Sequence, residues 1–118
     1  MQPGWLDGQG GVGFDAPWVW PERAESPRLQ ATLIGATSGL AMSVYSPAPS
    51  LQVYTGGALD GSLPKHAGKA GQVYGPRAGI CLEPQGYPDA PNHAHFPSSV
   101  IRAGETFIDE VTYAFHWI

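Results

Sequence analysis

The sequence is poor in cysteine and in charge, and it has no long apolar run. The single cysteine, Cys81, cannot form a disulfide within the chain. Charged residues make up 14% of the chain and the net charge is −4, so neither nucleic acid nor an anionic membrane surface is expected as a partner. No run approaches the roughly 20 apolar residues of a transmembrane helix, and the N-terminus lacks the features of a signal peptide. These absences favour a cytoplasmic protein.

Helical periodicity is also absent from the sequence. Sixteen glycines and twelve prolines argue for many turns and against long helices. Hydrophobic residues make up 42% of the chain, which is typical of a globular protein, and 118 residues suffice for one small domain. We therefore expect residues 1–118 to form a single β domain, in which residues 1–28 are an irregular lead-in rich in Gly, Pro and Trp.

Alternation of apolar and polar residues predicts about five strands. They are expected over residues 29–34, 40–44, 51–55, 78–83 and about 105–117. The fourth strand would bury Ala78, Ile80 and Leu82 and hold Cys81, and the fifth has a nearly continuous apolar face that includes Phe107, Phe115 and Trp117. A five-residue connection, 35–39, has hairpin length, whereas residues 59–75, which include His66, form a long surface loop. The predicted fold class is all-β, a part of a sandwich of antiparallel strands with long loops.

Glu83 is the first candidate catalytic residue. It follows the predicted strand directly, and Pro84 is expected to turn the chain away from the sheet edge. A carboxylate at the mouth of a rigid scaffold is well placed to act as a general base. The alternative is an ordinary solvated glutamate at the end of a strand.

The pair His93 and His95 offers a competing, metal-binding interpretation. Two histidines in the pattern H-x-H can face one metal ion when they lie on a strand, but such a motif also needs a third ligand nearby. The next acidic residue is Glu105, and prolines interrupt the segment. These features favour a surface loop over a metal site.

Several motifs in the same order resemble aldose 1-epimerases (galactose mutarotases). The phrase CLEPQGYPDAPNHAHFP resembles the family signature C-L-E-T-Q followed by P-D-A-x-N and F-P. LQVYTG followed by LDG resembles L-Q-x-Y-T-G-N-x-L-D-G, RAGET resembles R-P-G-E-x, and GFD followed by Trp18 resembles G-Y-D-H-x-F. The matches extend from about residue 13 to residue 115 and correspond to the C-terminal part of a family member.

The resemblance implies a fold, a reaction and site residues. The fold is a large galactose-mutarotase-like β-sandwich (supersandwich) with the sugar site on its concave face. The reaction interconverts the α and β anomers of a hexose such as galactose or glucose by acid and base catalysis, and it requires no metal or organic cofactor. By resemblance, Glu83 is the base, while Asp15 and Gln52 match positions that hydrogen-bond the hydroxyl groups of the monosaccharide. From residue type alone, an aspartate before Ala-Pro, such as Asp15, is usually a turn former, and a glutamine on the polar side of a short strand, such as Gln52, is usually exposed. With the resemblance counted, these readings and the sugar-binding roles are evenly balanced.

The sequence departs from the family pattern in one major respect. The family's acid is a histidine in an upstream motif, N-H-x-Y-F-N-L, which does not occur here. Smaller departures are Ala16 in place of His, Gly57 in place of Asn and Pro84 in place of Thr. The acid would then have to come from an N-terminal partner chain or from water. Open edges of a partial sheet also favour self-association. The alternatives are a non-catalytic sugar-binding β-domain and an inactive fragment.

Overall fold

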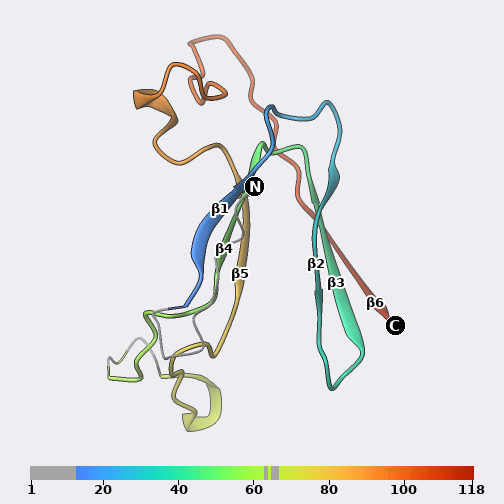
Figure 1. Ribbon diagram of the computed structural model, residues 1–118, viewed down its shortest axis with the longest axis vertical. Helices are drawn as coiled ribbons and strands as arrows, with labels where there is room; N and C mark the ends of the chain where they lie inside the picture. The colour runs from blue at the N-terminus through green and yellow to red at the C-terminus, as the bar shows by residue number, and fades with distance from the viewer. Residues whose placement is uncertain (1–12, 63, 65–66) are drawn as a thin grey trace. The chain divides into compact units, whose positions relative to one another are not determined.

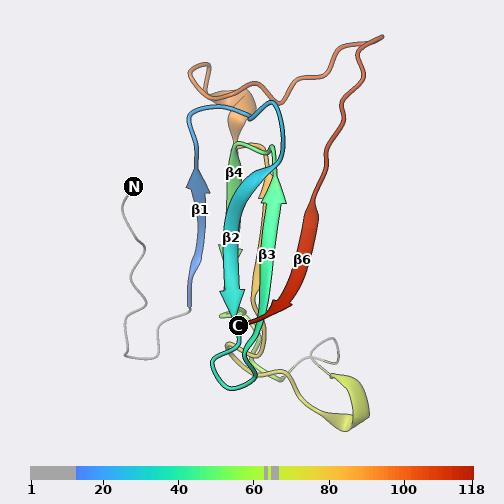
Figure 2. The same ribbon diagram turned by 90° about the vertical axis from the view of Figure 1, so that its right-hand side faces the viewer.

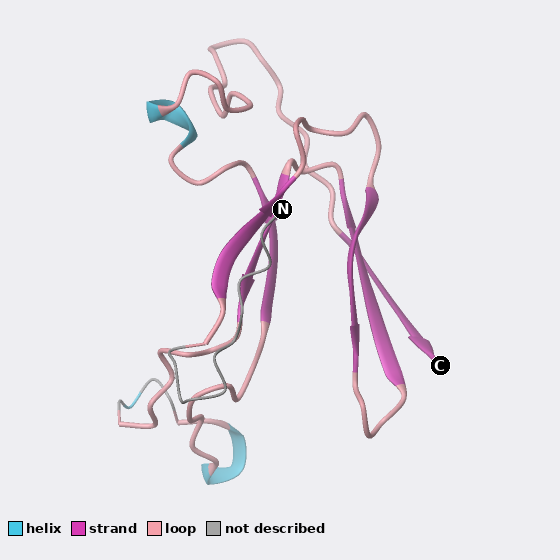
Figure 3. Cartoon of the chain, viewed as in Figure 1, coloured by secondary structure: helices cyan, strands magenta, loops and turns pink. Residues whose placement is uncertain are grey.

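Among the described residues the regular secondary structure is almost entirely β-strand, and long loops connect the strands (Figures 1 and 3). The computed structural model describes residues 13–62, 64 and 67–118. Within these ranges the elements are β1 (Asp15–Val19), β2 (Arg28–Ile34), β3 (Leu40–Ser46), β4 (Ser50–Tyr54), η2 (Lys69–Gly71), β5 (Cys81–Gln85), η3 (Ala90–Asn92) and β6 (Thr112–Trp117). The strands form two sheets, with the orders β1-β4-β5 and β2-β3-β6. The all-β prediction is confirmed, and the architecture is consistent with a fragment of a β-sandwich.

The chain divides into two compact units. The first comprises Met1–Trp18 and Gln52–Glu83, and the second comprises Val19–Leu51 and Pro84–Ile118. Most of the β1-β4-β5 sheet lies in the first unit, and the β2-β3-β6 sheet lies in the second. That residues 1–118 form a single domain stays a prediction. No helix within the described ranges has the length and apolar character needed to cross a membrane.

The β2-β3-β6 sheet is antiparallel throughout, and its strands lie side by side in Figure 2. The predicted hairpin is present: the Gly39 amide donates to the Gly35 carbonyl and the Gly35 amide donates to that of Leu40, each at 2.9 Å. Gly39 has φ +71°, a conformation that costs glycine little. The central strand β3 pairs Met42 with Leu33 on one side and with Phe115 on the other.

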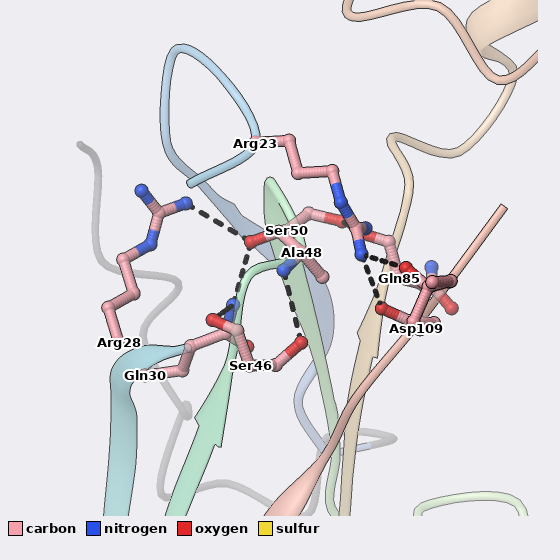
Figure 4. Close-up of polar contacts among 9 residues, drawn as sticks. Arg23, Arg28, Gln30, Ser46, Ala48, Ser50, Gln85 and Asp109 are labelled. Atoms are coloured by element: carbon pink, nitrogen blue, oxygen red, sulfur yellow. Dashed lines mark hydrogen bonds and ion pairs between the residues drawn. The ribbon is translucent and has the colours of Figure 1, made fainter. Parts of the chain in front are cut away.

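The interior contains mostly small residues. Among the described residues the buried hydrophobic side chains are those of Ala41, Val44, Ala48, Leu51, Val53 and Ala90. The connection between β3 and β4 is also buried and is held by polar contacts (Figure 4). The Ala48 carbonyl accepts from Gln30 Nε2 at 2.7 Å and from Arg28 Nη2 at 3.1 Å, and the Ala48 amide donates to Ser46 Oγ at 3.0 Å. Because its backbone groups are satisfied, this turn can be buried without a large desolvation penalty.

The predictions for the fourth strand need correction. The strand β5 begins at Cys81 and continues through Pro84 to Gln85, so Pro84 does not end it and Glu83 lies at its centre. A proline is tolerated there because β5 is an edge strand, whose outer N–H groups need no ladder partner. The expected burial is also wrong, since Ala78, Ile80 and Cys81 are exposed.

The fifth predicted strand is too long, because only its second half, β6, is a strand. The segment before it is held by side-chain contacts from Arg23 instead of a ladder. The Arg23 guanidinium donates to the Ile108 carbonyl at 2.8 Å and to Asp109 Oδ1 at 2.9 Å, and it lies 4.8 Å from the centre of the Phe107 ring. These three contacts are made within the second unit, and the Arg23–Asp109 pair is drawn in Figure 4.

One strand was not predicted. β1 lies within residues 1–28, where Gly, Pro and Trp obscure any alternation. It forms because it pairs with the central strand β4 of its sheet. The predicted loop over residues 59–75 contains the short η2 turn and an isolated antiparallel bridge between Ala67 and Val73 among its described positions, and His66 lies outside the described residues.

Candidate functional site

The strand β4 is the centre of the candidate site because it lies between β1 and β5. Its side chains alternate: Leu51 and Val53 are buried, whereas Gln52 between them is only half-buried. Gln52 Nε2 donates a hydrogen bond of 2.5 Å to Asp15 Oδ1 on β1. Two of the three predicted site residues are therefore in direct contact.

Backbone contacts at both ends define how β1 and β4 pair. The Thr55 amide donates to the Phe14 carbonyl at 2.9 Å, and the Trp20 amide donates to the Pro49 carbonyl at 2.8 Å. These bonds place Asp15 diagonally across from Gln52, on the same face, and residues in this relation are within reach of long side chains. At the Phe14–Thr55 end of this pair, the Thr55 hydroxyl also accepts a hydrogen bond from the Phe14 amide at 2.7 Å.

The position of Glu83 follows from the contacts between β4 and β5, which lies on the other side of β4 from β1. Ser50 Oγ contacts the carbonyls of Gln85 and Gly86, each at 3.0 Å, and a Cβ on Gly56 would lie 3.0 Å from the Gly79 carbonyl. β4 and β5 are neighbours that run in opposite directions (Figure 1), so these contacts place Glu83 opposite Gln52. Directly opposite residues share a face, so Asp15, Gln52 and Glu83 form a row across three adjacent strands. We call these three residues the polar row.

The burial pattern agrees with this pairing. On the opposite face, Leu82 and Pro84 of β5 are half-buried beside the buried Leu51 and Val53 of β4. Glu83, in contrast, is exposed. One face of the sheet is therefore apolar and the other presents the polar row.

The polar row offers both free and oriented hydrogen-bonding groups. The Asp15 and Glu83 carboxylates are exposed and accept hydrogen bonds. Gln52 Oε1 is buried and has no hydrogen-bond partner among the described residues, while Nε2 of the same amide is held by Asp15. A ligand with several hydroxyl groups would satisfy all three side chains, because each hydroxyl both donates and accepts.

A shallow pocket of about 350 Å³ lies in the same unit, lined by Thr55, Arg77, Gly79 and Ile80. Arg77 has φ +65°, which is uncommon for a residue with a side chain, and its amide donates to the Gly56 carbonyl at 3.2 Å. Neither Thr55 nor Arg77 stands out in the sequence as a site residue. An arginine after Gly-Pro gives no sign in the sequence that it will line a pocket.

His93 and His95 make contacts typical of a packed loop. His93 Nε2 lies 3.1 Å from Asp89 Oδ2, and the rings of both histidines lie 4.6 Å from that of Phe96. Within the described ranges, no three His, Cys, Asp or Glu residues come together as a metal-binding group. His116 is exposed on β6, and these three histidines belong to the second unit.

The hydroxyl of Ser50 should contribute measurably to stability. Ser50 is fully buried, and its Oγ contacts the Gln85 and Gly86 carbonyls at the end of β5. We expect Ser50→Ala to lower the free energy of unfolding by about 1–3 kcal/mol, because the part-buried carbonyls of Gln85 and Gly86 lose their donor. Urea denaturation followed by circular dichroism measures this change. The exposed Ser99 is the matched control, and equal effects of Ser50→Ala and Ser99→Ala would contradict the assignment.

Comparisons with known proteins agree with the motifs. The family model described as aldose 1-epimerase matches residues 2–114. The chain is 41% identical to the galactose mutarotase of Rattus norvegicus over 95 residues, which cover 80% of this chain and 27% of the rat protein. It is 46% identical to that of Homo sapiens over 72 residues (61% and 20%) and 29% identical to the aldose 1-epimerase of Escherichia coli K12 over 105 residues (87% and 29%). The chain thus spans less than a third of the length of these relatives.

Proposed function

Because the chain belongs to the aldose 1-epimerase family, we propose that it supplies the base and hydroxyl-binding residues for interconverting the anomers of a hexose such as galactose or glucose. The polar row carries this proposal. It brings the three residues chosen from the family resemblance onto one face of three adjacent strands, and Gln52 bonds directly to Asp15. An edge-strand carboxylate beside two hydroxyl-binding side chains suits a sugar whose reacting group is itself a hydroxyl.

In the proposed reaction Glu83 removes the proton from the C1 hydroxyl group. The electron pair of that oxygen forms the carbonyl while the bond between C1 and the ring oxygen breaks, and the ring oxygen takes up a proton. The open aldehyde rotates about the bond between C1 and C2 and closes on its other face, after which both protons return. No redox change occurs, and no group is transferred to another molecule.

The proton for the ring oxygen requires a donor outside the polar row. By the family resemblance this donor is a histidine upstream of the region matched here, in a motif that the sequence lacks. We propose that a partner segment supplies the acid, with water as a less efficient substitute. The chain alone would then supply the general base but not the general acid, and it would accelerate anomer exchange only weakly.

Asp15 and Gln52 are proposed to orient the sugar. The hydrogen bond between them orients both side chains, and the exposed carboxylate of Asp15 accepts from a sugar hydroxyl. A fixed hydrogen-bonding group loses less conformational entropy when the ligand binds. This arrangement also supports the second candidate function, sugar binding without catalysis.

Replacing Gln52 with leucine should weaken sugar binding. The change keeps the size of the side chain and removes the amide, so the complex loses about one hydrogen bond and the dissociation constant rises roughly 5–10-fold. Titration of galactose into isotope-labelled protein, followed by NMR shifts, measures the constant. Gln72, exposed in the same unit, is the matched control as Gln72→Leu. An unchanged constant in Gln52→Leu would remove Gln52 from the binding site.

Magnetisation-transfer NMR tests the proposed reaction directly. The exchange rate between the α and β anomers of galactose is compared in buffer, with the chain, and with the chain plus a fragment of rat galactose mutarotase that lacks the stretch matched by this chain. Acceleration that is largest with both proteins supports the proposal. Saturable binding with no acceleration in either sample would leave the sugar-binding function and exclude catalysis.

A further inference from the structure

The polar row has more hydrogen-bond acceptors than donors. The carboxylates of Asp15 and Glu83 accept only, and the amide nitrogen of Gln52 already gives one of its two protons to Asp15. A hexose carries several oxygens that accept hydrogen bonds, in addition to the protons that its hydroxyl groups donate. A site for such a ligand therefore needs a further donor on the same face of the sheet.

Tyr54 is the next residue of β4 on this face. Alternate residues of a strand point the same way, so Tyr54 lies on the side of Gln52 and is half-buried like it, whereas Val53 between them is buried. The strands β1, β4 and β5 lie side by side in Figure 1. Their pairing contacts place Tyr54 between Asp15 on β1 and the exposed Cys81 on β5. Its side chain therefore adjoins the polar row.

The hydroxyl group of Tyr54 is held in place while its proton stays available. Its Oη accepts a hydrogen bond from the Ala58 amide at 2.9 Å, and Ala58 lies in the turn that follows β4. Because the amide is the donor in this bond, the phenol keeps its own proton for another acceptor. Among the described residues, no acceptor is bonded to that proton. A donor that is oriented before the ligand arrives loses less conformational entropy on binding.

We propose that Tyr54 donates a hydrogen bond to a hydroxyl oxygen at the C4–C6 end of the hexose and helps to determine which hexose is bound. Two residues of a strand span about 7 Å, so with C1 at Glu83, opposite Gln52, the Tyr54 hydroxyl lies toward the other end of the sugar. Galactose and glucose differ only in the configuration at C4, so a donor at that end can distinguish them. This role rests on the proposed function, because Glu83 marks the position of C1.

A purely structural role for the Tyr54 hydroxyl is the alternative. The bond from Ala58 would then only hold the turn after β4, and its loss would disturb the site as a whole. The two roles differ in their dependence on the sugar. A structural loss weakens the binding of every hexose by the same factor, whereas a direct contact matters only for a sugar that carries the matching hydroxyl group.

The experiment titrates four sugars into the isotope-labelled full chain and follows NMR shifts, for wild type and for Tyr54→Phe. The sugars are galactose and its 2-deoxy, 4-deoxy and 6-deoxy derivatives. Tyr74→Phe is the matched control, because Tyr74 is 40% exposed in the same unit and lies outside the strands. Ala58 is exposed, so water can replace the lost hydroxyl at its amide and Tyr54→Phe should fold normally.

We expect Tyr54→Phe to raise the dissociation constant of galactose roughly 5–10-fold, as for the loss of one hydrogen bond. It should leave unchanged the constant of one sugar, the 4-deoxy or the 6-deoxy derivative, which lacks the partner hydroxyl. The constant of 2-deoxygalactose should rise as much as that of galactose, because C2 adjoins C1.

An equal loss for all four sugars, or no loss for any, would overturn the role of Tyr54 and leave the proposed function standing. A rise in Tyr74→Phe equal to that in Tyr54→Phe would overturn it too. Failure of the wild-type chain to bind any of the four sugars would instead overturn the proposed function, and the role of Tyr54 with it.

Discussion

Replacing Glu83 with glutamine is expected to lower protein-dependent anomer exchange about 10²–10⁴-fold, the usual contribution of a positioned general base. Glutamine keeps the size of the side chain and its hydrogen-bonding capacity but cannot take a proton at neutral pH. Glu83 is exposed at the centre of an edge strand, so the substitution should leave folding intact. Magnetisation-transfer NMR on the chain with the rat fragment measures the rate.

Glu110→Gln is the matched control for this measurement. Glu110 is exposed and lies just before β6, outside the polar row, so its substitution should leave the rate unchanged. An equal rate for wild type and Glu83→Gln, with sugar binding intact, would show that another group acts as base. Binding of the fragment is measured separately by co-purification, so a loss of docking cannot be mistaken for a loss of the base.

The alternation of apolar and polar residues was sufficient to predict most of the strands. β2, β3 and β4 lie where alternation placed them, and the connection after Ile34 is the expected hairpin. The failures occurred where strand formation depends on distant contacts. β1 forms by pairing with β4, and the region around Phe107 is held by Arg23 from the other end of the chain instead of continuing β6. Neither interaction leaves a periodic signal in the sequence.

The candidate site was predictable from motifs but not from periodicity. Asp15, Gln52 and Glu83 are separated by 37 and 31 positions, and only the strand order β1-β4-β5 brings them together. The contact between Asp15 and Gln52 could not be inferred from residue type, because β1 itself was not expected. Burial was misjudged for Cys81 and Ile80 because an apolar residue on a predicted strand was assumed to face a core. The roles of the three site residues stay predictions.

Leu51 should be the most sensitive position for stability among those described. It has no exposed surface and is the largest fully buried side chain, whereas the other buried hydrophobic residues among those described are all alanine or valine. Leu51→Ala is expected to lower the free energy of unfolding by about 2–5 kcal/mol, because small neighbours fixed in a sheet cannot collapse into the space. That is a large part of the roughly 5–15 kcal/mol by which domains are stable.

Urea denaturation of Leu51→Ala and Leu29→Ala tests this expectation. Leu29 is 53% exposed on β2, so Leu29→Ala should lower the free energy of unfolding by less than about 1 kcal/mol. Leu51 and Gln52 are neighbours on opposite faces of β4, which means that the buried side chain anchors the strand that presents the amide. The folded fraction of Leu51→Ala should still bind galactose, since the polar row is unchanged. If Leu51→Ala lowered the free energy of unfolding by less than about 1 kcal/mol, the interior would have to repack around the deletion. The polar row would then depend on backbone pairing and not on the anchoring of Leu51.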